Sequence, residues 1–176
     1  MRYAFAMLVV AAVTMPAFGE GVFGPKVTPG QGDWEIKISG TGANDRKFKN
    51  GGFELTADVG RFVTPELLVA LRQSVSYTSF APGDAWGGNT RVAVDYHFDL
   101  GNFQPFIGAN LGYVYGDNVR DTWAAGPEAG VKYYMQDNAF LFLRTEYQFF
   151  FRRGRDLDDG FRDGNFLYTV GAGLNF

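Results

Sequence analysis

Residues 166–176, with the sequence FLYTVGAGLNF, decide the fold. Every second residue of this stretch is apolar or aromatic, and most of the residues between them are small or polar. The apolar set is Phe166, Tyr168, Val170, Ala172, Leu174 and Phe176. A period of two indicates a β-strand with two unlike faces. Aromatic side chains form girdles at the membrane interfaces of transmembrane barrels, so an apolar face that ends on phenylalanine predicts a transmembrane β-strand.

The first residues have the features of a secretory signal peptide. Arg2 supplies a positive charge, residues 4–13 form a short apolar run, and Ala17-Phe18-Gly19 resembles a cleavage site. The run is shorter than the ~20 apolar residues that a spanning helix needs. We therefore expect residues 1–19 to be a signal peptide that exports the chain. Residues 20–32, which carry prolines and glycines, are expected to form a short periplasmic segment, and residues 33–176 a single barrel domain.

The composition excludes some partners and fits export. The formal net charge is only −3, so the chain lacks the basic surface that nucleic acid requires. It contains no cysteine, which fits an exported protein without disulfides. Aromatic residues make up 17% of the chain and glycines number 24, as is common in membrane barrels that alternate apolar and polar positions.

Alternating runs and turn signals follow one another eight times. The predicted strands are residues 33–42, 52–62, 66–80, 89–99, 103–116, 122–135, 139–152 and 166–176. Short turns are expected at Thr64-Pro65, Gly101-Asn102 and Asp137-Asn138, and longer polar connections at 43–51, 81–88, 117–121 and 153–163. Short turns at one end and long loops at the other are typical of outer-membrane barrels. Because an open sheet edge in lipid leaves backbone groups unpaired, we predict an all-β fold, an eight-stranded antiparallel up-and-down barrel.

The second face of these strands carries the charged residues. The predicted inward-facing polar network is Glu35, Lys37, Glu54, Asp58, Arg72, Arg91, Asp95, His97, Glu128, Lys132, Arg144 and Glu146. Reversing this assignment would place Arg144 near the lipid midplane at a cost of ~2 to 4 kcal/mol. Eight strands enclose a space that side chains can fill. We therefore expect an ion-paired lumen without a wide pore, in which the sequence leaves the individual pairs open.

Some residues depart from this pattern. Gln73 and Thr145 lie on the apolar face in mid-strand, and the expected explanation is a bulge that shifts the phase. Phe106 lies on the inward face, where it is expected to pack against a lumen glycine such as Gly108. Phe140, Phe142 and Phe150 share that inward face, and those near strand ends are expected to line the rims; no account is offered for Phe150.

The chain resembles the family of small eight-stranded outer-membrane β-barrels, which includes the OmpA transmembrane domain and OmpX. The closest local similarity is Gly126-Pro127-Glu128-Ala129-Gly130-Val131-Lys132-Tyr133-Tyr134, followed by Asp137-Asn138 and Leu143-Arg144-Thr145-Glu146-Tyr147. The last strand is similar to the signal that the barrel assembly machinery reads, which implies that role for Tyr168, Val170, Leu174 and Phe176. The resemblance covers residues 33–176 and does not extend to the peptidoglycan-binding domain of OmpA, so no cell-wall anchoring role is expected.

The expected function is structural, or an interaction at the cell surface through the long connections, by a monomer in the bacterial outer membrane. Two sets of basic residues in the long connections are candidates for binding lipopolysaccharide phosphates. They are Arg152, Arg153, Arg155 and Arg162 around the last connection and Arg46, Lys47 and Lys49 in the first. A narrow channel for small solutes is the first alternative. A lipid A-modifying enzyme is the second, with His97 and Asp95 joined by Ser39, Ser74 or Ser76. A soluble barrel that binds small lipids is a further alternative and would place the apolar face inside. We expect no enzyme activity, cofactor or metal.

Overall fold

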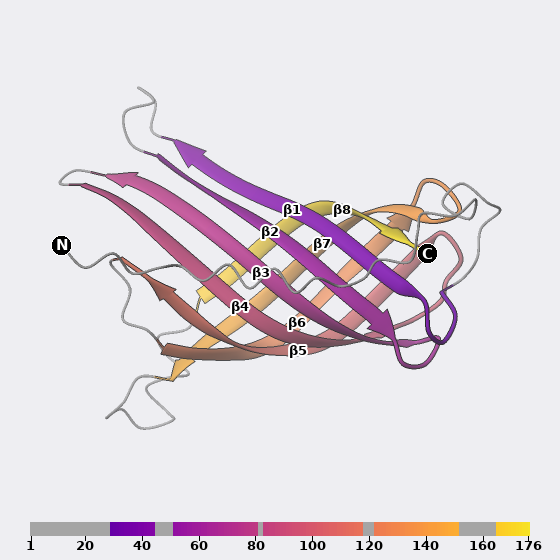
Figure 1. Ribbon diagram of the computed structural model, residues 1–176. Coiled ribbons are helices and arrows are strands. Elements are labelled where there is room, and N and C mark those ends of the chain that lie inside the picture. The colour runs from indigo at the N-terminus through magenta and orange to yellow at the C-terminus, as the bar shows by residue number, and fades with distance from the viewer. Residues whose placement is uncertain (1–28, 45–50, 81–82, 118–121, 152–164) are drawn as a thin grey trace.

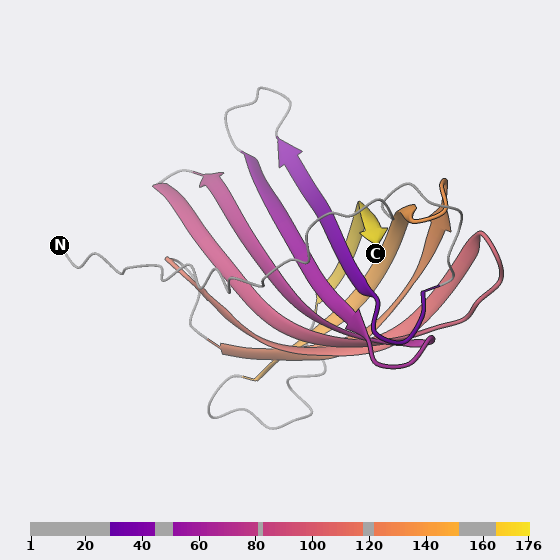
Figure 2. The same ribbon diagram turned by 45° about the vertical axis from the view of Figure 1, so that its right-hand side comes forward.

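The computed structural model describes residues 29–44, 51–80, 83–117, 122–151 and 165–176, and these ranges form a closed barrel (Figure 1). The strands are β1 (Trp34–Asn44), β2 (Gly51–Phe62), β3 (Leu67–Phe80), β4 (Gly83–His97), β5 (Phe103–Gly116), β6 (Thr122–Tyr134), β7 (Ala139–Phe151) and β8 (Asn165–Asn175). Each strand pairs antiparallel with its neighbours in the chain, and β1 pairs with β8 to close the sheet. Figures 1 and 2 show the strands inclined around a common axis. The predicted fold class is confirmed.

The short connections lie at one end of the barrel together with the start of β1 and the end of β8. Residues 63–66, 98–102 and 135–138 join neighbouring strands there, which is where the short turns were expected. Trp34 N donates to the carbonyl of Phe176 at 2.8 Å, and Phe176 N donates to the carbonyl of Trp34 at 3.0 Å. The two described ends of the sheet are therefore hydrogen-bonded to each other. The predicted signal peptide, 1–19, and most of the predicted segment 20–32 lie outside the described residues.

The long connection predicted for residues 81–88 is wrong, because β4 already begins at Gly83. The ladder between β3 and β4 continues to the pair Phe80–Gly83. Two contacts hold this extension: the rings of Tyr77 and Trp86 lie 4.8 Å apart, and Ser79 Oγ donates to Asp84 Oδ1 at 2.8 Å. Glycine and aspartate suggested a loop, but cross-strand contacts outweigh the low strand propensity of those residues.

The bulges predicted at Gln73 and Thr145 are also wrong. Every ladder keeps a single register along its length, including the partners of β3 and β7. Gln73 remains on the outer face, where its Nε2 donates to Tyr115 Oη at 3.0 Å and its Oε1 accepts from Thr90 Oγ1 at 2.7 Å. A polar side chain can stay on an apolar face when its neighbours satisfy its hydrogen bonds.

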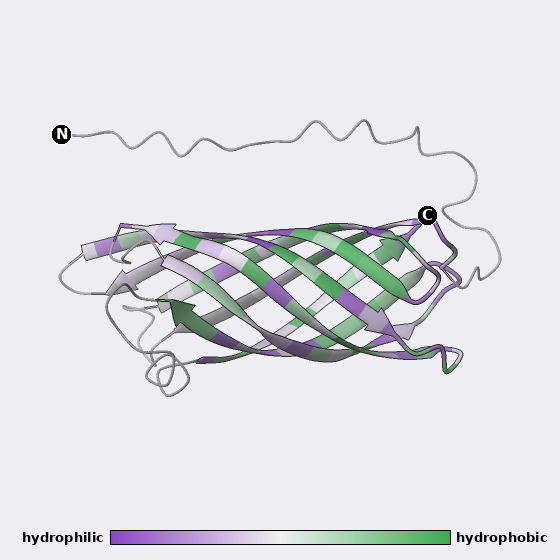
Figure 3. Ribbon diagram, turned by 90° about the horizontal axis from the view of Figure 1, so that it is seen from below, coloured by the Kyte–Doolittle hydropathy of each residue, from purple (hydrophilic) through white to green (hydrophobic). Residues whose placement is uncertain are grey.

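The polarity of the barrel is the reverse of that of a water-soluble globule. Ile38 and Val170 on the outer face are 65% and 62% exposed, whereas Arg72 and Arg144 are 0% and 1% exposed. Figure 3 shows hydrophilic and hydrophobic residues alternating along the strands. No helix in the described ranges is long and apolar enough to span a membrane. The large apolar side chains therefore cover the outside of the wall, and the charged side chains fill its interior.

Candidate functional site: the barrel interior

The strict alternation of the strands places one side chain in two inside the barrel. Eleven of the twelve residues predicted for the inward polar network are buried there. They are Glu35, Lys37, Asp58, Arg72, Arg91, Asp95, His97, Glu128, Lys132, Arg144 and Glu146. Glu54 has the same parity but is only half-buried, and Thr56 Oγ1 donates to it at 3.4 Å. The structure therefore brings most of the predicted residues into one compartment.

Asp58 on β2 lies at the centre of the interior. Its Oδ2 accepts from Arg72 Nε at 3.0 Å and from Arg144 Nη1 at 3.0 Å. Lys37 Nζ lies 3.6 Å from the same oxygen. Three cations from β1, β3 and β7 therefore meet one carboxylate, which ties together strands that are distant in the sequence.

Arg72 connects Asp58 to two further carboxylates. Its two terminal nitrogens bind Glu128 in a bidentate pair, with both contacts at 2.9 Å, and Nη1 also lies 3.3 Å from Glu146 Oε2. Glu146 in turn is bound by Arg91 and lies 3.9 Å from Arg144 Nε. A bidentate guanidinium–carboxylate pair fixes orientation as well as charge.

A second group of charges lies around Glu35 on β1. Lys37 Nζ lies 3.0 Å from Glu35 Oε1, and Lys132 on β6 donates to Glu35 Oε2. We call these nine ion-paired residues the lumen network. It comprises Glu35, Lys37, Asp58, Arg72, Arg91, Glu128, Lys132, Arg144 and Glu146.

Neutral polar side chains extend the lumen network toward the long connections. Asn110 on β5 donates to Glu128 and Glu146 through Nδ2, and Gln148 Nε2 donates to Glu146 Oε1 at 2.9 Å. Ser74 Oγ hydrogen-bonds Thr56 Oγ1 at 2.8 Å and accepts from Arg91 Nη2 at 3.3 Å. Each carboxylate of the lumen network thus has at least one cation as a partner, which is the condition under which buried ion pairs are tolerated.

The short-turn end of the interior is closed by an apolar plug, of which the sequence predicted only the inward orientation of Phe106, Phe140, Phe142 and His97. The plug consists of Phe62, Leu68, His97, Phe106, Tyr134, Phe140 and Phe142. The His97 ring lies between Phe62 and Phe106, with centroid distances of 5.4 and 5.3 Å. Lys132 Nζ lies 5.4 Å from the Phe62 ring centroid and 5.0 Å from that of Phe140. A signal existed, because all seven residues have inward parity and lie within a few positions of the three short turns.

Phe106 packs against a lumen glycine, as expected, but this glycine is Gly130, the residue opposite it on β6, and the example Gly108 was wrong. The space at Gly108 is occupied instead by the side chain of Asp95. The other two plug rings on β7 follow the same rule, since Phe140 covers Gly173 and Phe142 covers Gly171. A glycine on the neighbouring strand leaves room for each ring, so register around the barrel decides which glycine is covered.

His97 does not take part in a catalytic triad within the described residues. Its Nδ1 lies 3.3 Å from the carbonyl of Glu66, and its ring is enclosed by the plug. None of the hydrogen bonds of the described residues joins His97 to Ser39, Ser74 or Ser76, and Ser74 bonds Thr56 and Arg91 instead. In the same ranges no three His, Cys, Asp or Glu side chains are grouped as metal ligands.

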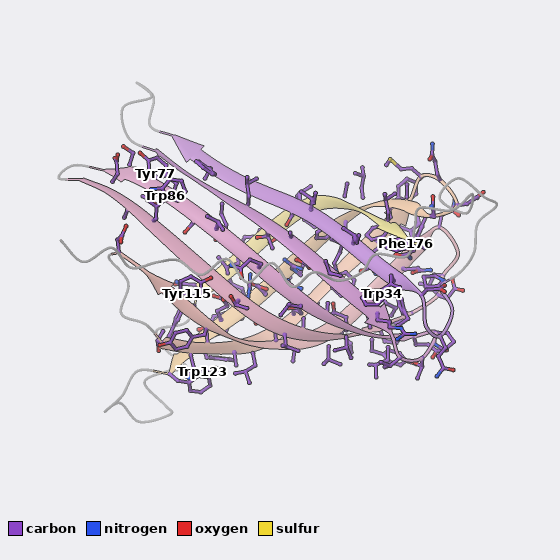
Figure 4. All side chains as sticks on the ribbon, in the orientation of Figure 1. Trp34, Tyr77, Trp86, Tyr115, Trp123 and Phe176 are labelled. Carbon is purple, nitrogen blue, oxygen red and sulfur yellow. The ribbon has the colours of Figure 1, made fainter. Side chains whose placement is uncertain are left out.

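Aromatic side chains form two rings on the outer surface. Figure 4 shows Tyr77, Trp86, Tyr115 and Trp123 at one end of the barrel, and Trp34 and Phe176 at the other. Contacts link neighbours within each ring, as in the pair Tyr113–Trp123 at 5.5 Å and the pair Phe103–Tyr133 at 4.8 Å. Exposed apolar side chains such as Leu71, Val92, Leu111 and Leu143 cover the wall between them. An apolar belt between two aromatic girdles is the pattern of a transmembrane barrel.

No family model and no curated protein matches the chain, but solved structures do. The N-terminal β-barrel domain of Pseudomonas aeruginosa OprF is 21% identical, with 84% of this chain and 99% of that chain covered and a TM-score of 0.58. The outer membrane protein OprG from Pseudomonas aeruginosa is 12% identical, with coverage of 84% and 97% and a TM-score of 0.55. Neisserial surface protein A is 16% identical, with coverage of 81% and 94% and a TM-score of 0.52. The chain therefore has the fold of small eight-stranded outer-membrane barrels, which confirms the resemblance at the level of fold.

Proposed function

We propose that the protein is a monomeric β-barrel of the bacterial outer membrane with a structural or surface-interaction role and a lumen without a wide pore. The observation that carries this proposal is the apolar belt between two aromatic girdles, around an interior that buries ten charged side chains. Such a surface is unfavourable in water, and such an interior is stable only inside a closed wall. The soluble lipid binder requires the opposite polarity.

The filled interior supports the absence of a wide pore. The lumen network occupies the middle of the barrel, and the apolar plug fills its short-turn end. A narrow channel would need a continuous polar path, and the plug interrupts that path with packed rings. We propose that the long connections carry the surface interaction. Arg46, Lys47 and Lys49 in the first of them, like the arginines around the last, lie outside the described residues and are proposed to bind lipopolysaccharide phosphates.

Expression of the full chain in a Gram-negative host tests the location, and planar bilayers test the pore. The protein is expected in the outer-membrane fraction, with a gel mobility in detergent that changes on boiling, because a stable barrel resists unfolding by detergent alone. Purified protein is expected to give no large stepwise conductance. Recovery in the soluble fraction would contradict the location, and large regular conductance steps would contradict the closed lumen.

Assembly through the last strand is part of the proposal. Tyr168, Val170 and Leu174 point outward along β8, and Phe176 is hydrogen-bonded to Trp34 through the backbone. We expect Phe176→Ala to lower the amount of barrel in the outer membrane while purified protein still refolds in detergent. Phe151→Ala, an exposed aromatic at the end of β7, is the matched control. Equal losses in both variants would contradict recognition of this strand by the barrel assembly machinery.

A further inference from the structure

Asp95 differs from the other fully buried carboxylates of the barrel. It is 1% exposed, and neither of its carboxylate oxygens accepts a hydrogen bond from any group in the described ranges. Glu35, Asp58, Glu128 and Glu146 each form at least one ion pair. An isolated buried carboxylate is costly, so an unsatisfied one in this position requires an explanation.

Glu128 is the acidic residue that the strand register places across Gly108 from Asp95. Asp95 on β4 lies opposite Gly108 on β5, and Gly108 lies opposite Glu128 on β6. Because Gly108 has no side chain, the Asp95 carboxylate lies over Gly108, on the side of β4 that faces Glu128. A methyl group at position 108 would run into the Asp95 carboxylate.

Glu128 is the member of the pair that is held as an anion. Arg72 binds both of its oxygens at 2.9 Å, and Asn110 donates a further hydrogen bond to Oε2. Asp95 has no such support. The cations that face it are Lys37 on β1, Arg72 on β3 and Lys132 on β6, and none of them forms an ion pair with it. Its own strand also carries Arg91, which binds Glu146, and His97, whose ring is enclosed in the plug.

We propose that Asp95 and Glu128 form a proton-binding site in which Asp95 is protonated and its carboxyl O–H donates a hydrogen bond to the Glu128 carboxylate. The proton provides a hydrogen-bond donor between the two carboxyl groups, where no protein group in the described ranges donates to Asp95. It also removes the repulsion between two ionised carboxylates. With Asp95 neutral, the inward-facing charges balance. Five cations then face five anions, which are Glu35, Glu54, Asp58, Glu128 and Glu146. The site does not depend on the cellular role of the barrel, because it follows from the interior alone.

Infrared spectroscopy of detergent-folded protein at neutral pH detects the proton directly. Wild-type protein is expected to show the carbonyl stretch of a protonated carboxylic acid, and Asp95→Asn is expected to abolish it. Asp99→Asn, at an exposed turn, is the control and should leave the band unchanged. The proposal is wrong if the wild type lacks the band or if Asp95→Asn retains it. A wild type without the band would have both carboxylates ionised, which would indicate a bound cation between them.

Unfolding rates in urea give a second, independent test. An asparagine at position 95 can still donate to Glu128, so Asp95→Asn is expected to unfold within about threefold of the wild-type rate. Asp58→Asn removes a carboxylate that three cations share and is expected to accelerate unfolding about 100-fold or to prevent folding. An Asp95→Asn barrel that unfolds as fast as the Asp58 variant, or that fails to fold, would show that Asp95 is an ionised partner and would overturn the proposal.

Discussion

The lumen network and the apolar plug are built from inward-facing positions of the same strands, yet they fill the barrel in different ways. In the lumen network, Asp58 and Glu146 each bind more than one cation, so the loss of one of these carboxylates affects several charged residues. In the plug, Phe106, Phe140 and Phe142 each cover a glycine on the neighbouring strand. The stability of the lumen network depends on the balance of its charges, and the stability of the plug depends on how well its side chains fill the available volume. The comparison teaches that one alternating pattern can encode two kinds of core.

The largest effect is expected from Arg72→Met, which breaks the lumen network at its most connected cation. Asp58, Glu128 and Glu146 each lose a partner, and an uncompensated buried charge typically costs ~3 to 5 kcal/mol. The free energy of unfolding in urea, followed by tryptophan fluorescence in detergent, measures the loss. Arg61→Met is the control, because Arg61 is exposed near a turn. If both variants lose the same small amount, the lumen network contributes little to stability.

A somewhat smaller loss, about 3 kcal/mol, is expected from Phe140→Ala in the apolar plug, because it leaves a cavity over Gly173. The loss should not change with salt, in contrast to the loss in a charge variant. The matched control is Leu141→Ala, the neighbouring residue on the outer face. The free energy of unfolding measured at low and at high salt gives both the size of the loss and its dependence on salt. A loss in Phe140→Ala that changes strongly with salt would contradict a plug stabilised by packing alone.

Lys132→Met sharpens the comparison, because Lys132 belongs to the lumen network and also lies over the plug rings. Glu35 keeps Lys37 after the change, and the methionine stem can still pack against Phe62 and Phe140. We expect the free energy of unfolding to fall by about 1 to 2 kcal/mol, which is less than the loss expected for Arg72→Met. A loss as large as that of Arg72→Met would mean that Lys37 does not compensate Glu35.

How much of this could be predicted from sequence differs between the two regions. Strand parity is local, so the inward charges and the closed sheet could be predicted. The pairs could not, because Lys132 and Glu35 are 97 residues apart and meet only through the register of the whole barrel. The plug was predicted only in part, since Phe106, Phe140 and Phe142 were assigned to the inward face. Phe62 and Leu68 were missed because they look like ordinary apolar strand residues until their parity is counted from the short turns. The start of β4 at Gly83 was missed because Gly83 and Asp84 have the composition of a loop.

The smallest effect is expected from Gln73→Leu, on the outer face. Thr90 and Tyr115 keep a hydrogen bond to each other at 3.3 Å, and an apolar side chain suits the belt. The free energy of unfolding in lipid vesicles should change by less than about 1 kcal/mol. Val75→Leu, two positions along the same face, is the matched control. A loss comparable to that of Arg72→Met would show that the polar trio on the outer face is as important as the lumen network.

The most direct test of the inverted polarity is electron paramagnetic resonance of single spin labels along β8. The chain has no cysteine, so one cysteine at a time can be introduced at positions 166 to 170. In lipid vesicles, labels replacing Phe166, Tyr168 and Val170 are predicted to collide with oxygen dissolved in the bilayer and to be shielded from a water-soluble nickel reagent. Labels replacing Leu167 and Thr169, which have inward parity, are predicted to be shielded from both. Accessibility without this alternation, or oxygen contact at Leu167 and Thr169 in place of their neighbours, would contradict the account.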